Sequence, residues 1–140
     1  MNATTIFKEN EMKKTVARTA ILDILKKAKK PIDVVEIIKK LKDKKIQIDR
    51  ATVFRNISLL VNKRLVNKVE FNEGKYRYES ASLPHHHHLF CTKCGNVSDI
   101  ESNSLHSEID KISKTVNKAF DFKIEEHKIE FFGKCKTCKN

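Results

Sequence analysis

In the first half of the chain, apolar residues recur at intervals of three and four. This spacing places them on one face of a helix. Thr15, Asp33 and Asp49 stand just before the three stretches that show it, and all three residue types favour the N-cap position. The spacing therefore predicts three helices, after a polar arm or frayed helix at residues 1–14. They run from Thr15 to about Lys29, from Asp33 through Leu41, and from Asp49 to about Lys63.

Beyond residue 64 the pattern changes to alternation. Residues 65–71 and 75–79 alternate on either side of Asn72-Glu73-Gly74, which favours a turn. Three helices followed by a hairpin is the order of a winged helix-turn-helix, whose third helix enters the major groove of DNA. Outward side chains of that helix and cations of the hairpin are the expected DNA contacts. They are Arg50, Thr52, Phe54, Arg55 and Asn56 on the helix, and Lys75 and Arg77 on the hairpin.

An aperiodic segment at residues 80–84 separates the two halves, and we place a hinge there. The charge changes at the same point. Residues 1–82 carry 20 Lys and Arg against 10 Asp and Glu, whereas residues 83–140 carry 9 against 8. A general enrichment in lysine explains part of the net charge of +11 but not this asymmetry, which is typical of a nucleic-acid-binding module joined to another module. The predicted domains are therefore 1–82, which binds DNA, and 83–140.

The second domain is predicted to be a small α/β unit, which makes the chain as a whole α+β. Strands are expected at residues 85–91 and 96–100, on either side of a turn. A helix is expected next, because apolar residues recur at intervals of four, three and four: Leu105, Ile109, Ile112 and Val116. Phe120, Phe122 and Ile124 then alternate as a further strand, which must bulge or turn near residues 125–126.

The four cysteines form two Cys-x-x-Cys pairs, Cys91 with Cys94 and Cys135 with Cys138. Four thiolates complete a tetrahedral structural zinc site. No apolar run approaches the roughly 18 residues of a membrane span, and the N-terminus lacks a signal-peptide segment. We therefore expect a cytoplasmic protein without membrane association, in which thiols stay reduced. In that setting the spacing favours zinc over free or disulfide-bonded cysteines.

Four consecutive histidines, His85 to His88, precede the first cysteine pair. In an extended segment His86 and His88 share one face, and His85 and His87 share the other, so one peptide can serve two metal sites. The further ligands are expected to be Glu79 and Asp99 for the first site, and His106, Glu108 and His127 for the second. Alternatively, His106 and Glu108 lie on a solvated helix flank and His127 is a packed neutral side chain. Mixed imidazole and carboxylate ligands suit Zn(II), Fe(II) or Mn(II).

Several segments resemble the ferric uptake regulator family. Asp49–Leu60, DRATVFRNISLL, is similar to that family's recognition helix. Arg77-Tyr78-Glu79, His85–Cys94 and the ending His127–Cys135 resemble its metal core in the same order. The resemblance covers about Thr15 to Cys138. It implies a homodimeric repressor with an N-terminal winged helix and a C-terminal α/β dimerisation domain, in which a metal near the hinge sets the separation of the two winged helices.

The resemblance also implies roles for individual residues. It implies that the four cysteines bind structural zinc. It implies a sensing site formed by Glu79, His86 and His88 with Asp99, and a second metal site formed by His85, His87 and His127. Ungapped counting from Cys94 puts His106 at the last position of the second site, where members usually have Glu; a two-residue slip selects Glu108 instead. In the DNA-binding domain it implies base or sugar contacts from Phe54, phosphate or guanine contacts from Arg55, and a backbone contact from Arg18.

The sequence departs from the family in two respects that bear on function. Many members place a sensing histidine before the second helix, whereas no histidine precedes His85 here. Phe54 replaces the usual tyrosine and keeps only an apolar face for a thymine methyl. Glu79 stands where peroxide-sensing members have aspartate, which argues against that branch.

The predicted function is therefore a metal-dependent repressor of metal homeostasis that binds a palindromic double-stranded operator. It would carry structural Zn(II) and a regulatory Fe(II) or Zn(II), with Mn(II)-sensing or peroxide-sensing members of the same family as alternatives. A zinc-dependent hydrolase is the competing class, but the sequence lacks an H-E-x-x-H motif, so we expect no enzyme. A metal-buffering protein is a third interpretation, and it leaves the recognition-like helix unexplained.

Overall fold

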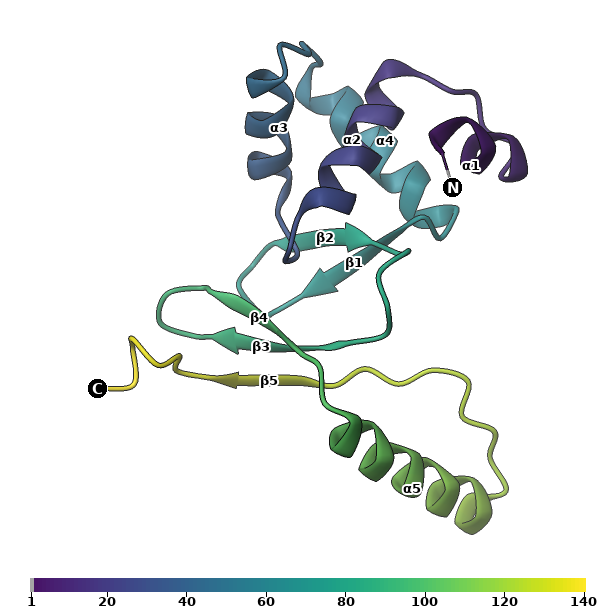
Figure 1. The fold of residues 1–140 in the computed structure, drawn as a ribbon, viewed down its shortest axis with the longest axis vertical. Helices are drawn as coiled ribbons and strands as arrows, with labels where there is room; N and C mark the ends of the chain where they lie inside the picture. The colour runs from purple at the N-terminus through teal and green to yellow at the C-terminus, as the bar shows by residue number, and fades with distance from the viewer. Residues whose placement is uncertain (1) are drawn as a thin grey trace. The chain divides into compact units, whose positions relative to one another are not determined.

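The fold is that of a computed structural model, which describes residues 2–140. The chain forms two compact units, the first ending at Pro84 and the second beginning at His85 (Figure 1). This division lies two residues beyond the boundary expected from the sequence. No helix formed by the described residues is both long and apolar enough to cross a membrane.

The first unit contains the three predicted helices, a preceding short helix and the predicted hairpin. Thr15, Asp33 and Asp49 are the N-caps of α2, α3 and α4, and each side chain accepts a hydrogen bond from the backbone N–H three residues on. The capped starts confirm the helix positions read from the sequence. The elements are α1 (Ala3–Glu9), α2 (Val16–Lys27), α3 (Val34–Asp43), α4 (Arg50–Asn62), β1 (Val66–Glu70) and β2 (Tyr76–Ser80).

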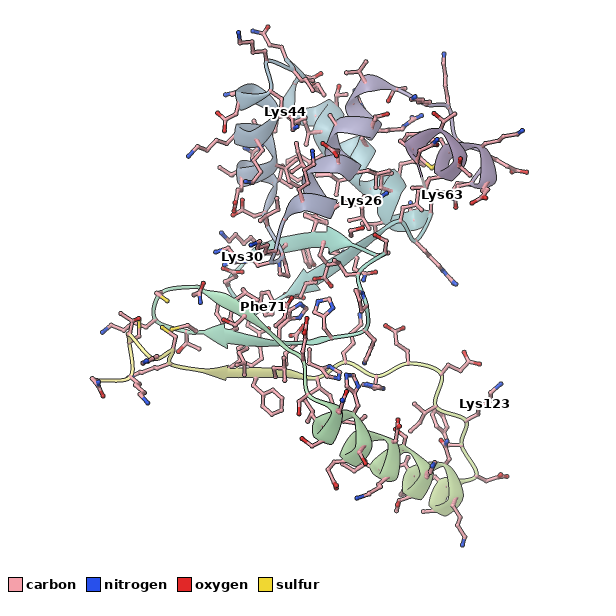
Figure 2. The ribbon with its side chains drawn as sticks, viewed as in Figure 1. Lys26, Lys30, Lys44, Lys63, Phe71 and Lys123 are labelled. Carbon is pink, nitrogen blue, oxygen red and sulfur yellow. The ribbon has the colours of Figure 1, made fainter. Side chains whose placement is uncertain are left out.

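The core of this unit lies where the apolar faces of the helices meet. Ile21, Ile37, Val53 and Leu60 are completely buried in it. The hairpin is antiparallel, with Val66 opposite Ser80, and Ile32 pairs with Tyr78 through two backbone hydrogen bonds that attach the hairpin to the segment before α3. Lysine side chains such as Lys26 and Lys44 project from the surface (Figure 2).

The second unit is a three-stranded sheet with one helix. It comprises β3 (His87–Cys91), β4 (Val97–Ile100), α5 (Asn103–Phe120) and β5 (Glu130–Gly133). The strand order is β4-β3-β5, with β4 antiparallel and β5 parallel to the central β3 (Figure 1). The β3–β4 turn contains Gly95, whose φ of 71° is in the region that favours glycine. Because β4 and β5 both pair with β3, their side chains lie next to those of His87, His88 and Cys91.

The strand predicted through Phe120, Phe122 and Ile124 is wrong. Phe120 is the last residue of α5, and Asp121 ends the helix in a left-handed conformation with a φ of 48°. Phe120 and Phe122 are 75 % and 61 % exposed, so their alternation reflects no buried sheet face. Residues 122–129 then form neither helix nor strand before β5 begins.

Candidate metal centres and nucleic-acid interface

The four cysteines converge although Cys94 and Cys135 are 41 positions apart in the sequence. Cys91 ends β3, Cys94 lies in the following turn, and Cys135 and Cys138 follow β5, which runs parallel to β3. The four Sγ atoms lie within 4.8 Å of one another, and the Cys94 and Cys135 sulfurs are 3.8 Å apart. Sulfurs about 2.3 Å from a tetrahedral zinc are about 3.8 Å from each other. The cluster therefore has the composition and the dimensions of a structural zinc site.

Hydrogen bonds within this cluster lower the pKa values of two thiols and raise that of a third, an arrangement that favours the binding of a cation. The backbone N–H of Cys135, 3.3 Å from the Cys91 sulfur, is the main reason that the pKa of Cys91 is lowered to about 6. The pKa of Cys138 is raised to about 12, chiefly because its thiol hydrogen-bonds to Cys135. Thiolate character at Cys91 and Cys135 matches the ligand charge that zinc requires, and a bound zinc would replace the shared protons.

A second cluster consists of four imidazoles, from His85, His87, His106 and His127. The ligand nitrogens of the first three lie within 4.8 Å of one another, and the Nε2 atoms of His85 and His127 are 3.1 Å apart. Burial is the main reason that the pKa values of His85 and His87 are lowered from 6.5. Both imidazoles are therefore neutral at pH 7, which is the form that binds metals.

Glu108, the alternative fourth ligand, lies apart from this cluster. Its carboxylate is 2.7 Å from the Lys111 ammonium, and its side chain is 65 % exposed. Residues two positions apart in a helix point in nearly opposite directions, so α5 can direct only one of the two candidates, His106 or Glu108, toward β3. The structure brings His106 to the cluster.

On the opposite face of β3, His86 and His88 form a pair whose Nε2 atoms are 3.1 Å apart. Asp99 is paired with His88 in the β3–β4 register, and its carboxylate is 3.9 Å from His88 Nε2. The structure thus brings together three of the four residues predicted for the sensing site. Glu79, the fourth, lies on β2 of the first unit, opposite Asn67.

The N-terminal half of α4 carries the predicted recognition residues. Arg50, Phe54 and Arg55 are exposed, and the Arg50 guanidinium lies 5.4 Å from the centre of the Phe54 ring. Thr52 and Asn56 are half-buried and make intramolecular hydrogen bonds. The Thr52 hydroxyl accepts from Arg55 at 3.0 Å, and the side-chain oxygen Oδ1 of Asn56 accepts from Arg18 of α2 at 3.1 Å. These contacts hold the exposed side chains on a fixed helix.

Both cations of the hairpin are held by acidic residues. Arg77 donates to Glu73 through Nε at 2.6 Å and through a terminal nitrogen at 2.9 Å. Lys75 lies 2.5 Å from a carboxylate oxygen of Asp33, the N-cap of α3. The pKa of Glu73 is lowered, mainly by the hydrogen bond from Arg77. Sequence reasoning missed both carboxylates, although the turn position of Glu73, four residues before Arg77, was a usable signal.

Comparison with known proteins identifies the family of the chain. The model of the ferric uptake regulator family matches residues 9–132. The chain belongs to the ferric uptake regulator family. Two relatives, both named ferric uptake regulation protein, show how the similarity extends. The Bacillus subtilis (strain 168) protein is 34 % identical over 100 residues, or 69 % of this chain, and the Neisseria gonorrhoeae protein is 26 % identical over 133 residues, or 94 % of it.

The family fold extends over both units of the chain. The alignments cover 64 % of the Bacillus subtilis relative, 58 % of a Campylobacter jejuni relative and 90 % of the Neisseria gonorrhoeae relative. The Vibrio cholerae ferric uptake regulator has a TM-score of 0.80 and 27 % identity, covering 94 % of this chain and 98 % of that one. The Helicobacter pylori ferric uptake regulator shares the fold, with a TM-score of 0.82 at 21 % identity over 98 % of this chain and 89 % of that one.

Proposed function

We propose that this member of the ferric uptake regulator family is a metal-dependent, DNA-binding transcriptional repressor of metal homeostasis. One observation carries the proposal: a helix with an exposed cationic and aromatic face shares a chain with three clusters of metal-ligating side chains. The structure of the Vibrio cholerae relative is described in terms of its DNA-binding domains, which supports the same role for the first unit. The α4 face suits the major groove of a duplex, and the clusters suit divalent cations.

Within this proposal, α4 reads the operator. Arg55 has the guanidinium geometry for guanine or phosphate, and Phe54 offers its exposed ring to a thymine methyl. Arg50 lies beside Phe54 and adds a cation near the backbone. Arg18 contacts the DNA backbone or fixes α4 through Asn56. Lys75 and Arg77 contribute less, because Asp33 and Glu73 already offset their charges.

Two metal sites would give the repressor its stability and its response. Zinc at the four cysteines would join the β3–β4 turn to the segment after β5. A regulatory Fe(II) or Zn(II), with Mn(II) as the alternative, would be held by His86, His88 and Asp99 together with Glu79. Because Glu79 belongs to the first unit, such an ion would limit the movement of the DNA-binding unit about residues 80–84. Linkage then requires operator DNA to tighten metal binding by the same factor.

A homodimer accounts for apolar surface on the second unit. Leu89 and Phe131 are neighbours across the β3–β5 pair and are 46 % and 45 % exposed. Ile112 of α5 is 62 % exposed. Exposed apolar side chains of this size in one small unit are typical of an interface. Light scattering should give twice the chain mass, and Leu89→Lys should shift the protein toward monomer.

The central test is metal-dependent selection of DNA. Zinc-loaded protein is mixed with a random duplex library under added Fe(II) without oxygen, Mn(II) or Zn(II), and the recovered duplexes are sequenced. The proposal expects a palindrome with at least one of these ions, and fluorescence anisotropy with that duplex should show affinity lost after chelation. Loss of binding on addition of hydrogen peroxide would identify the peroxide-sensing alternative. Recovery of no palindrome with any ion would contradict the proposal.

Variants separate the regulatory site from general effects of charge. His86→Ala and Glu79→Ala should each lower metal-stimulated operator affinity at least tenfold, because each removes one ligand of the regulatory ion. Glu126→Ala, which changes an exposed carboxylate in the irregular segment, is the matched control and should bind as the wild type does. Normal metal-stimulated binding by both ligand variants would exclude this site as the switch.

A further inference from the structure

Asp49, Thr52 and Arg55 form a chain of hydrogen bonds along the N-terminal turns of α4. The Thr52 hydroxyl donates to Asp49 Oδ2 at 2.5 Å and accepts from a terminal nitrogen of Arg55 at 3.0 Å. The other carboxylate oxygen of Asp49 accepts from the Thr52 backbone N–H at 2.9 Å, which is the N-cap bond of the helix. The Asp49 carboxylate therefore has two tasks: it caps α4, and it holds the hydroxyl of Thr52.

The direction of this chain follows from the charges at its two ends. An ionised carboxylate only accepts hydrogen bonds, a guanidinium only donates them, and a hydroxyl has one proton and two lone pairs. The Thr52 proton therefore belongs to the bond with Asp49, and a lone pair of the hydroxyl faces Arg55. The side-chain hydrogen bond from Thr52 is the main reason that the pKa of Asp49 is lowered, and the charge of Arg55 lowers it further, so the carboxylate is ionised at neutral pH.

The bond to Thr52 draws the Arg55 guanidinium toward the N-terminal end of α4. Side chains three positions apart lie on the same face of a helix, and long side chains lean toward its N-terminus. In a helix-turn-helix, residues at this end of the recognition helix contact base edges in the major groove. A guanidinium has five N–H donors, of which Thr52 takes one, so the others remain for O6 and N7 of a guanine and for a phosphate oxygen.

An arginine that is fixed before DNA arrives recognises a base more selectively than a mobile one. An exposed arginine has many rotamers, and a bidentate contact to guanine requires a particular one. A side chain already held in that direction loses less conformational entropy on binding. Thr52 can hold Arg55 because a threonine in a helix has few χ1 rotamers, and the bond to Asp49 selects among them.

We propose that Asp49 and Thr52 are positioning residues for base recognition, which orient Arg55 toward a guanine of the operator. This role rests on the DNA-binding function proposed above and names the residues that set its specificity at one base pair. It differs from the expectation that Thr52 contacts DNA itself. The only hydroxyl proton of Thr52 is donated to Asp49, so it is not available to a phosphate or to a base acceptor.

Base preference at a single operator position tests this role. The duplex selected with metal is the reference, and the position read by Arg55 is the one at which Arg55→Ala loses the preference for guanine. Fluorescence anisotropy gives that preference as the ratio of affinities for duplexes with and without the guanine. Thr52→Val, which removes the hydroxyl at nearly constant size, should lower this ratio at least about fivefold and leave preferences at all other positions within about twofold.

Further variants separate the hydrogen bonds from side-chain size and from capping. Asp49→Asn keeps both the size and the cap, since asparagine and aspartate are equally good N-caps. Its amide nitrogen donates to the Thr52 hydroxyl, whose proton then points toward a guanidinium that can only donate. Asp49→Asn should therefore lower the guanine ratio as Thr52→Val does, whereas Thr52→Ser should restore it. Ser58→Ala, on the exposed surface of α4, is the matched control and should leave the ratio unchanged.

Three results would overturn the proposal. The first is a guanine ratio that Thr52→Val leaves unchanged. The second is an equal loss of affinity for every duplex, which is the result expected of a phosphate contact or of general destabilisation. The third is a loss of preference in Thr52→Val at a position other than the one lost in Arg55→Ala, which would show that Thr52 contacts a base directly.

A measurement without DNA separates this role from the repressor function. Nitrogen-15 relaxation of the arginine Nε–H groups reports the rigidity of each guanidinium on the picosecond-to-nanosecond timescale. The order parameter of Arg55 should fall in Thr52→Val and Asp49→Asn and should keep its wild-type value in Thr52→Ser. That of Arg77, which Glu73 holds, should stay constant throughout.

The two proposals can therefore fail separately. A mobile Arg55 in the wild-type protein would overturn the positioning role even where a palindrome is selected with metal. A rigid Arg55 in a protein that selects no palindrome would leave the chain of hydrogen bonds in place and remove the base-reading and repressor roles together.

Discussion

Glu73 holds the Arg77 guanidinium with two hydrogen bonds, of 2.6 and 2.9 Å, across the hairpin turn of the first unit. Their side chains are 17 % and 12 % exposed, so solvent screens this pair less than it screens a surface ion pair. Lys75, whose side chain is 47 % exposed, donates a single hydrogen bond to Asp33. Two cations and two carboxylates thus offset each other at the hairpin, whereas Arg50 and Arg55, the exposed cations among the predicted recognition residues, lie on α4.

This cancellation predicts the salt dependence of DNA binding. Each phosphate contact contributes about one to the slope of log affinity against log salt concentration. Arg55→Ala should lower that slope by about one, whereas Arg77→Ala should change it by much less, because Glu73 already compensates its charge. Anisotropy titrations at several salt concentrations measure both. An equal drop in the two variants would show that Arg77 leaves Glu73 to bind a phosphate.

The pairing of Glu73 with Arg77 also predicts that the free energy of unfolding of the first unit depends on pH. The Arg77 hydrogen bond lowers the pKa of Glu73 below its ordinary 4.5 in the folded state. A carboxyl group with a lowered pKa stabilises the fold above the unfolded-state value, and this contribution is lost as the pH falls through the folded-state value. Glu73→Gln should therefore cost roughly 1 kcal/mol at pH 7. This deficit should shrink as the pH falls below 4.5.

Tyrosine fluorescence makes this measurement specific to the first unit. The chain has two tyrosines, Tyr76 and Tyr78, and no tryptophan, and both tyrosines lie on β2. Urea unfolding followed by this signal gives the free energy of unfolding of the first unit at each pH. A deficit of the same size at pH 3 and pH 7 would exclude the pair as the source of the pH dependence.

Removal of the structural zinc should affect the second unit selectively. Cys135→Ser removes one of four ligands and should lower the zinc content by one ion per chain, with loss of the β3–β5 sheet in circular dichroism. Thr137→Ala, between Cys135 and Cys138 in the sequence, is the matched control and should retain zinc. The first unit, followed by its tyrosine fluorescence, should unfold at an unchanged urea concentration. A Cys135→Ser protein with full zinc content would contradict the site.

Substitutions at two residues of α4, one turn apart, should affect stability and DNA binding separately. Ile57 is 2 % exposed in the core, and Phe54 is 40 % exposed one turn earlier. Ile57→Ala should lower the free energy of unfolding by roughly 2–5 kcal/mol, because it leaves a cavity. Phe54→Ala should change it by less than about 0.5 kcal/mol and weaken operator binding. A large loss of stability in Phe54→Ala would place that ring in the core instead of at the DNA.

Much of this molecule could be read from local sequence. N-caps act on amides three residues away, and for that reason Thr15, Asp33 and Asp49 marked the helix starts correctly. The paired Cys-x-x-Cys spacing was equally informative, because two thiols at that separation already face one ion. The alternation of Phe120 and Phe122 misled, since a period of two over three residues also occurs by chance at the end of a helix.

What the sequence by itself determined is therefore the order of elements and the kinds of metal ligand. Only the tertiary structure decided which ligands meet. The rotation of α5 selects His106 over Glu108, and the parallel pairing of β5 with β3 brings Cys135 to Cys94. The pairing of Lys75 with Asp33, which are 42 positions apart, likewise could not be predicted from the sequence. Such contacts depend on how whole elements pack, and no short-range pattern encodes that packing.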